Sequence, residues 1–221
     1  MATGNKSTLK NHNDIILFTE KNFYKVKDDG ALEKTEIDDK NINLNIYIDS
    51  PIFSLIPEEI FQNISSTEKN SFLVPNVSEY TFFEEFIPEQ NAYLIWAEEK
   101  NVIEKLLADY PTMTIHHFSE RFLHKKQHIN GIEIFLNKSF IYITAFKNQH
   151  IQLINRFEVN NEDDVLYYLL SVIKEADLIN EEFKIVNYSQ VKNNIRKQLV
   201  DIFKVRQEDF YTNKSLKEIN L

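Results

Sequence analysis

The sequence predicts a mixed α/β protein made of two related subdomains, each with a mixed sheet of about βββαβα order and flanking helices. The chain of 221 residues is long enough to bury a core without disulfides or metals. Both halves show a similar order of strand-like and helix-like patterns, with three antiparallel strands followed by a helix, a strand and a helix. Two mixed sheets with a cleft between them are therefore expected.

The first half shows the period of two that is typical of strands. It is clearest at residues 42–48, where every second residue is isoleucine or leucine. Pro57 suits the first position of a helix, and the acids that follow it suit the positive end of the helix dipole. The predicted elements are strands at 14–18, 23–26 and 42–48, a short helix from Pro57, a strand at 92–97, a helix at 98–108 and a strand at 112–116.

The second half is more regular, and its helix at 162–177 has the strongest pattern. Asn160 or Asn161 can cap this helix, three acidic residues occupy its first turn, and one wide face is apolar. The predicted elements are strands at 131–136, 140–146 and 151–157, the helix, a strand at 183–186 and an amphipathic helix at 191–203.

These elements divide the chain into five segments. Polar residues at the beginning and at the end carry little of either periodicity, and Asn130-Gly131 marks the start of a new set of strands. The segments are a disordered or frayed N-terminus at 1–13, an N-terminal subdomain at 14–118, a connector at 119–129, a C-terminal subdomain at 130–204 and a tail at 205–221.

Composition excludes several classes of protein. There is no cysteine, so structural disulfides, zinc–thiolate sites and cysteine nucleophiles are absent. The net charge of −9 disfavours a broad nucleic-acid surface, which needs clustered lysine and arginine. The N-terminus lacks the apolar core of a signal peptide, and no apolar run approaches the length of a membrane span. A cytoplasmic protein without membrane insertion is expected.

Three stretches carry a resemblance to a known family. They read FSLIPEEIF at 53–61, TIHHF at 114–118, and NRFE at 155–158 followed by EDDVLYYLL at 162–170. With them the chain resembles an uncharacterised family of Bacteroidetes proteins that has the actin-like ATPase fold, a ribonuclease H-like architecture. The resemblance implies this fold for both subdomains. It carries over no activity, although relatives of the fold include adaptor proteins of pilus and secretion machines.

Nucleotide binding by an actin-like protein requires glycine-containing turns, because backbone N–H groups must approach the phosphates closely. The corresponding turns here, at 19–22, 136–139 and 186–189, contain no glycine, and the whole chain has only 3. Glu20 would also place a negative charge near an anion. The sequence thus predicts a pseudo-ATPase without a cofactor. Weak nucleotide binding, in which Lys138 and Ser139 contact a phosphate, is the alternative.

Metal-dependent chemistry has two candidate sets of residues. His117, Glu120 and His124 would share a helical face as a two-histidine, one-carboxylate site, with His116 and His128 nearby. The simpler interpretation is a polar connector, and no metal is predicted.

A nuclease-like enzyme would use an acid in each sheet. Glu133 and Asp14 occupy such places, but one acid per sheet is not a two-metal site. The three acids at 162–164 are explained by the helix dipole.

The function predicted from sequence is a non-catalytic interaction or scaffold protein. Lys192, Arg196 and Lys197 lie on the last predicted helix and form a candidate surface for a protein partner, which the sequence does not identify. A solvated helix face is the plainer interpretation of these three residues. The aromatic segment at 80–86 is expected to lie in the core rather than in an exposed patch. A weak nucleotide-binding regulator and, second, a metal-dependent nuclease-like enzyme remain as alternatives.

Overall fold

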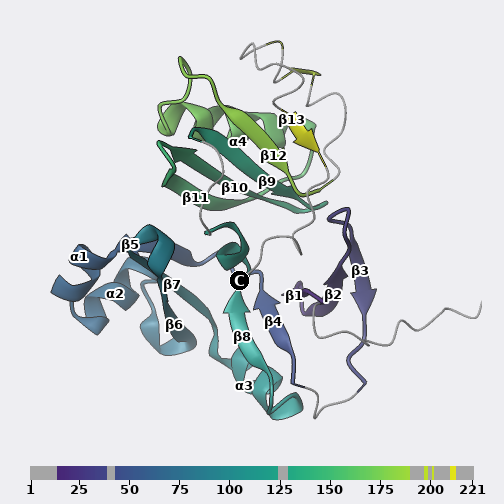
Figure 1. The fold of residues 1–221 in the computed structure, drawn as a ribbon. Coiled ribbons are helices and arrows are strands. Elements are labelled where there is room, and N and C mark those ends of the chain that lie inside the picture. The colour runs from purple at the N-terminus through teal and green to yellow at the C-terminus, as the bar shows by residue number, and fades with distance from the viewer. Residues whose placement is uncertain are drawn as a thin grey trace, which may run out of the picture. The chain divides into compact units, whose positions relative to one another are not determined.

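The computed structural model describes residues 14–38, 43–123, 129–189, 197–198, 201 and 210–212 (Figure 1). The chain forms two compact units. Unit 1 comprises residues 1–26 and 32–120, and unit 2 comprises residues 27–31 and 121–221. The short segment at 27–31 therefore belongs to unit 2, although it lies between two strands of unit 1.

Unit 1 contains a five-stranded mixed sheet of order β3-β2-β1-β4-β8. The first three strands pair antiparallel, and β4 and β8 continue the sheet in parallel. The strands are β1 (Ile16–Thr19), β2 (Asn22–Val26), β3 (Leu32–Thr35), β4 (Asn45–Ile48) and β8 (Thr114–His117).

The sequence misplaced the third antiparallel strand of this sheet. The alternating segment at 42–48 does form a strand, β4, but β4 pairs parallel to β1. The third antiparallel strand is β3, which no sequence pattern indicated. Its four residues are Leu-Glu-Lys-Thr, and its two charged residues are exposed at the sheet edge. A strand this short and this polar gives no apolar alternation.

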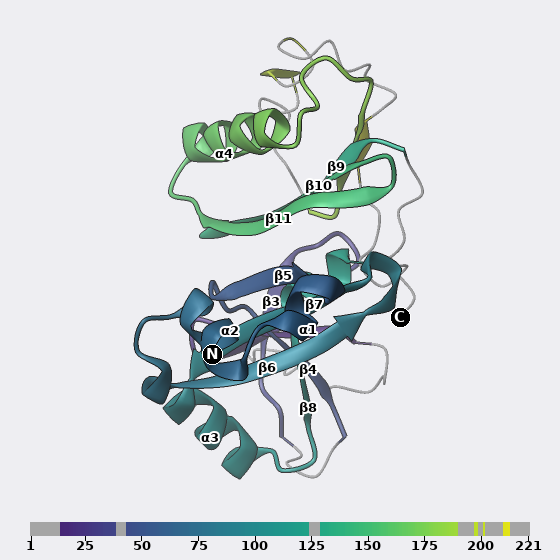
Figure 2. The same cartoon turned by 90° about the vertical axis from the view of Figure 1, so that its left-hand side faces the viewer.

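A second, three-stranded antiparallel sheet is inserted in unit 1 between β4 and β8. Its order is β5-β7-β6, with β5 at Phe53–Pro57, β7 at Ala92–Glu99 and β6 at Tyr80–Ile87. The predicted strand at 92–97 lies in this sheet as β7. Two short helices, α1 (Glu58–Asn63) and α2 (Ser66–Leu73), follow β5, and α3 (Lys100–Asp109) follows β7 (Figure 2). The aromatic segment forms β6, in which Phe83 stacks on the buried Trp96 while Phe86 stays 40% exposed.

Local signals explain how these helices begin and end. Ser65 caps α2 with a capping box: its side chain accepts from the Glu68 N–H, and the Glu68 carboxylate accepts from the Ser65 N–H. Pro57 stands directly before α1 and ends β5. Short 3-10 turns lie at Val77–Glu79 and Pro88–Gln90 in unit 1, and a third, at Phe118–Phe122, begins in unit 1 and ends in unit 2.

Unit 2 contains a five-stranded sheet of order β11-β10-β9-β12-β13. As in unit 1, three antiparallel strands are followed by two parallel ones. The elements are β9 (Gly131–Leu136), β10 (Phe140–Lys147), β11 (His150–Glu158), α4 (Glu162–Glu175), β12 (Lys184–Asn187) and β13 (Phe210–Thr212). Asn161 caps α4 by accepting from the Asp164 N–H.

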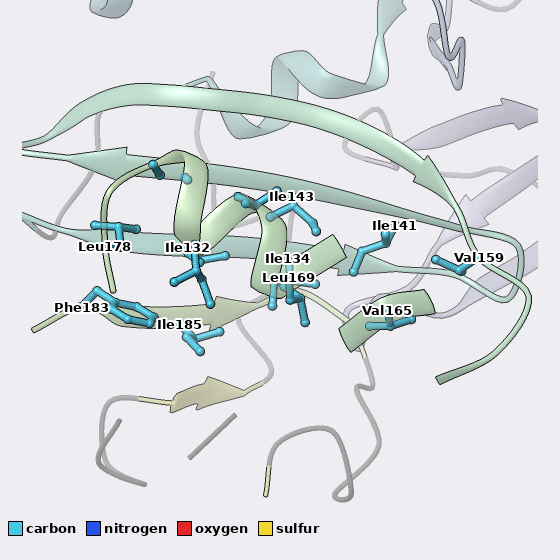
Figure 3. Packing of buried hydrophobic residues seen from close by; sticks show 14 residues of the cluster. Ile132, Ile134, Ile141, Ile143, Val159, Val165, Leu169, Leu178, Phe183 and Ile185 are labelled. Carbon is cyan, nitrogen blue, oxygen red and sulfur yellow. The ribbon is translucent and has the colours of Figure 1, made fainter. Parts of the chain in front are cut away.

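The core of unit 2 lies between its sheet and α4 (Figure 3). Val165 and Leu169 of α4 pack with Ile132, Ile134 and Ile141 of the sheet, and all five are buried. The apolar face that the sequence predicted for this helix is therefore its packing face. The predicted strands of this half all occur, whereas most of the predicted helix at 191–203 lies outside the described residues.

Glycine is required at position 30, in the short segment at 27–31 that belongs to unit 2. Gly30 has φ of +77°, and a Cβ there would lie 1.9 Å from the backbone oxygen of Tyr188. Only glycine tolerates both the conformation and the contact. Within the described residues, no helix is long and apolar enough to cross a membrane.

Candidate functional site

An apolar groove of about 540 Å³ lies along strand β5 in unit 1. Every residue from 51 to 57 lines it, joined by Ile60 and Ile64 from α1 and its end and by Phe72 and Leu73 of α2. Two of these side chains are unusually open for large apolar residues, Ile60 at 54% and Phe72 at 72% exposure. Large apolar residues gathered in one exposed groove are typical of a binding surface.

The lining shows that the groove follows the edge of the strand. Successive side chains of a strand point to opposite faces, so a groove over one face would contact every second residue. This groove contacts all of them. Strand β5 is also an outer strand of its sheet, since among the described residues it pairs with β7 alone.

The register tells which backbone groups of β5 point outward. Ala97 donates its N–H to the Ile52 oxygen, and Glu58 donates to the Asn91 oxygen, so the even-numbered residues bond toward β7. In an antiparallel ladder the intervening residues direct their N–H and C=O groups to the other side. Leu55 therefore points its backbone polar groups toward the groove. Pro57, which has no N–H to offer, ends the strand.

The charge around the groove is negative. Glu58 and Glu59 begin α1, and Glu59 is exposed. The one cation of the two helices, Lys69, is buried: its Nζ lies 3.2 Å from the centre of the Phe61 ring and 3.7 Å from Glu84. Lys69 is thus already paired with an acid of the same unit. A partner with basic residues beside an apolar segment would match this surface.

The histidines of the predicted cluster separate at the end of β8. His117 turns into the core, where Nδ1 contacts the Ser119 Oγ at 2.6 Å and Nε2 contacts the Ser50 carbonyl at 2.9 Å. Both of its ring nitrogens are engaged within the fold. His117 does not meet Glu120 as the metal-site alternative would have required, because the two histidines point to opposite sides of a strand.

It is His116 that meets Glu120, and Glu85 of β6 joins them. His116 Nδ1 lies 3.0 Å from Glu120 Oε2, and one potential donor atom from each of the three residues lies within 4.8 Å of the others. Glu120 is buried, and Tyr47 stacks on the His116 ring. Burial and the neighbouring Glu120 carboxylate raise the pKa of Glu85 to about 7. His124 and His128 lie outside the described residues.

The turns that would hold a nucleotide are arranged differently from phosphate loops. In the turn between β1 and β2, Glu20 and Lys21 both take positive φ angles, 50° and 60°, without being glycine. The turn therefore presents an exposed carboxylate. In the turn between β9 and β10, Lys138 is exposed and Ser139 is half-buried.

The third turn, after β12, satisfies its own polar groups. Ser189 donates its N–H to Asn187 Oδ1 at 3.1 Å, and Asn187 donates back to the Ser189 oxygen. The Ser189 hydroxyl in turn accepts from the Leu136 N–H at 2.8 Å. The N–H of Ser189 thus already has a partner within the turn.

The two acids of the nuclease alternative are each paired within their own unit. Asp14 accepts from Lys25 Nζ at 2.6 Å. Glu133 is buried on β9 and bonds the Tyr188 side chain; burial first, and then Glu133, raise the pKa of Tyr188 above its ordinary value. Neither acid belongs to the donor cluster found among the described residues.

The predicted partner surface can be followed only in part. Lys192 and Arg196 lie outside the described residues, and Lys197 is exposed in a short helical stretch. Lys192, Arg196 and Lys197 therefore stay a prediction. Sequence reasoning missed the groove and Glu85. The FSLIPEEIF segment was the one available signal for the groove, whereas nothing in the sequence links β6 to His116.

Two mixed sheets with the same strand order define a protein of the actin-like fold class, and similar solved structures agree. The chain is similar to a protein of Bacteroides thetaiotaomicron described as having an actin-like ATPase fold and unknown function, at 16% identity and a TM-score of 0.69, with 91% of each chain covered. It is also similar to the cytoplasmic domain of EpsL, an inner membrane component of the type II secretion system of Vibrio cholerae. That match has 7% identity, a TM-score of 0.50, and covers 81% of this chain and 83% of the other.

The family follows from the sequence match. Residues 33–203 match the family described as "Protein of unknown function (DUF3822)". This match covers more than half of the chain, so the protein belongs to that family. The predicted resemblance to an uncharacterised family with the actin-like fold is thereby confirmed. No curated protein matches the chain significantly.

Proposed function

We propose that this protein is a non-catalytic interaction module, which binds an extended segment of a partner protein along the open edge of β5. The observation that carries the proposal is the groove lined by every residue from 51 to 57. A strand added beside β5 would pair with the outward backbone groups at Leu55 and place its apolar side chains among Ile60, Phe72 and their neighbours.

The chemistry of the partner segment follows from the groove. Backbone pairing needs an extended chain, and the lining needs apolar side chains at least at alternate positions. The acidic start of α1 favours lysine or arginine beside the apolar residues. The fold similarity to a secretion-system component supports such a role by analogy of fold alone.

The nucleotide turns support a role without turnover. Glu20 presents a carboxylate where a phosphate would approach, and the turn at 187–189 already bonds its own backbone. The alternative of weak nucleotide binding through Lys138 and Ser139 rests on the exposure of Lys138. The nuclease-like alternative rested on Glu133 and Asp14, and neither of them belongs to the donor cluster found among the described residues.

A selection of random twelve-residue peptides displayed on phage tests the proposal. The full-length protein should enrich peptides in which apolar residues alternate and basic residues flank them. Ile60→Glu and Phe72→Glu place charges in the groove, and each should weaken the selected peptides at least tenfold by fluorescence anisotropy. Leu55→Pro should do the same, because it removes an outward N–H while leaving the bonds toward β7.

Leu107→Glu is the matched control, because Leu107 is an exposed leucine on α3 that does not line the groove. It should leave peptide binding unchanged. The proposal is wrong if no peptide is enriched, or if the enriched peptides bind the Ile60→Glu and Phe72→Glu proteins as tightly as the natural one. Circular dichroism of each variant separates lost binding from lost folding.

A further inference from the structure

Unit 1 gathers three potential metal ligands from three separate elements. Glu85 comes from β6 of the inserted sheet, His116 from the end of β8 in the five-stranded sheet, and Glu120 from the 3-10 turn that follows β8. The fold itself therefore brings them together, rather than one local run of acidic residues.

The distances suit a single ion. One donor atom from each residue lies within 4.8 Å of the other two, and His116 Nδ1 lies 3.0 Å from Glu120 Oε2. A tetrahedral ion with ligand bonds of about 2.1 Å needs donor atoms roughly 3.4 Å apart.

The surroundings hold the donors in place. Glu120 is 5% exposed and is held at the end of β8, and the ring of Tyr47 stacks on His116 with centroids 5.3 Å apart. Two carboxylates so close together repel one another, and a divalent cation between them would relieve that repulsion. Glu85 is half-buried, so the site is not sealed from solvent.

We propose that Glu85, His116 and Glu120 bind one divalent transition-metal ion, with water completing the coordination. One imidazole nitrogen and two carboxylate oxygens form a mixed donor set, which suits Zn²⁺ and Mn²⁺ better than the all-oxygen preference of Mg²⁺ and Ca²⁺. Zn²⁺ should bind more tightly than Mn²⁺, in the order usual for such ligands. The proposal is independent of the β5 groove, with which it shares no residue.

Isothermal titration of the full-length, chelator-treated protein with ZnCl₂, MnCl₂ and MgCl₂ is the direct test. One Zn²⁺ per chain is expected, with weaker Mn²⁺ binding and no measurable Mg²⁺ binding. Glu85→Gln should weaken Zn²⁺ at least tenfold while leaving the buried residues in place. His116→Ala should also lower the affinity. With Co²⁺ as a probe, the natural protein should show visible absorption bands that Glu85→Gln loses.

Glu84→Gln is the matched control. Glu84 neighbours Glu85 on β6 but points to the opposite face, where it lies 3.7 Å from Lys69. This variant should bind Zn²⁺ as the natural protein does. The proposal is overturned if the natural protein binds no stoichiometric Zn²⁺, or if Glu85→Gln binds it equally well, which would place the ion on other histidines of the chain.

Discussion

Adjacent residues with the same side chain have different environments at the end of β8. His116 stacks on Tyr47 and meets Glu120, while His117 is buried with contacts from its ring to Ser119 and Ser50. The alternation of a strand is the cause, because neighbouring side chains point to opposite faces. Histidines that adjoin one another in the sequence therefore lie in two environments, and only the environment of His116 contains acidic residues.

Glu98 on β7 gives a pH-dependent prediction at the same scale. Burial of the carboxylate, followed by the nearby charges of Glu99 and Asp49, raises its pKa above the ordinary value of 4.5, although a bond from the Glu99 N–H acts against this. The folded state thus holds the proton more tightly than the unfolded chain. The stability that this contributes is complete below pH 4.5 and is lost as the pH rises through the raised pKa.

Glu98→Gln removes that titration. The variant should match the natural protein in thermal stability near pH 4 and melt at a higher temperature near pH 8. Differential scanning calorimetry across this range provides the measurement. Glu89→Gln, at an exposed acid, is the control and should follow the natural protein throughout. Equal melting temperatures of the Glu98→Gln and natural proteins at pH 8 would contradict the prediction.

Among the elements, α4 has an apolar face that is evident in the sequence and that stabilises unit 2 by packing against its sheet. Leu169 is completely buried against the sheet of unit 2, in the centre of the cluster that Figure 3 shows. Leu169→Ala should destabilise the protein by about 2–5 kcal/mol, since it leaves a cavity in a closely packed core. Urea unfolding followed by circular dichroism measures the change.

Tyr167→Ala on the same helix is the comparison, because Tyr167 is 66% exposed. Tyr167→Ala should change the free energy of unfolding by no more than about 0.5 kcal/mol, as is usual for surface substitutions. Similar losses for the two variants would mean that α4 contributes little of the stability of unit 2.

The sequence identified elements well where a strong period and a clear cap coincided, as at α4 with Asn161. It failed at β3, a four-residue edge strand in which only Leu32 is apolar, and it assigned β4 to the wrong pairing. Strand direction depends on partners that are distant in the chain, and no local pattern contains it. The approach of Glu85 to His116 could not be predicted for the same reason, because the two residues lie in different sheets that only the fold brings together.

On the scale of the whole molecule, the fold and the absence of glycine in the nucleotide turns lead to a prediction about ATP. Millimolar Mg-ATP should leave the melting temperature unchanged within about 1 °C. A ligand present at 100 times its Kd would stabilise the fold by about 2.7 kcal/mol, which corresponds to roughly 5–11 °C for a chain of this size. Differential scanning fluorimetry with Mg-ADP and MgCl₂ as controls measures the shift.

An increase of several degrees with Mg-ATP would favour the nucleotide-binding alternative instead. Lys138→Ala would then identify the site, because this exposed lysine is the cation of the turn between β9 and β10. If the variant abolished the shift, the turn at 136–139 would be a phosphate contact despite having no glycine.

Gly30 has a consequence for any attempt to divide this protein. Unit 2 includes residues 27–31 as well as 121–221, and Gly30 fits against the backbone of Tyr188 where no larger residue could. One cut near residue 120 would therefore release a fragment that lacks part of its own packing. The two halves share a strand order, but they cannot be separated into two complete units by a single cut in the chain.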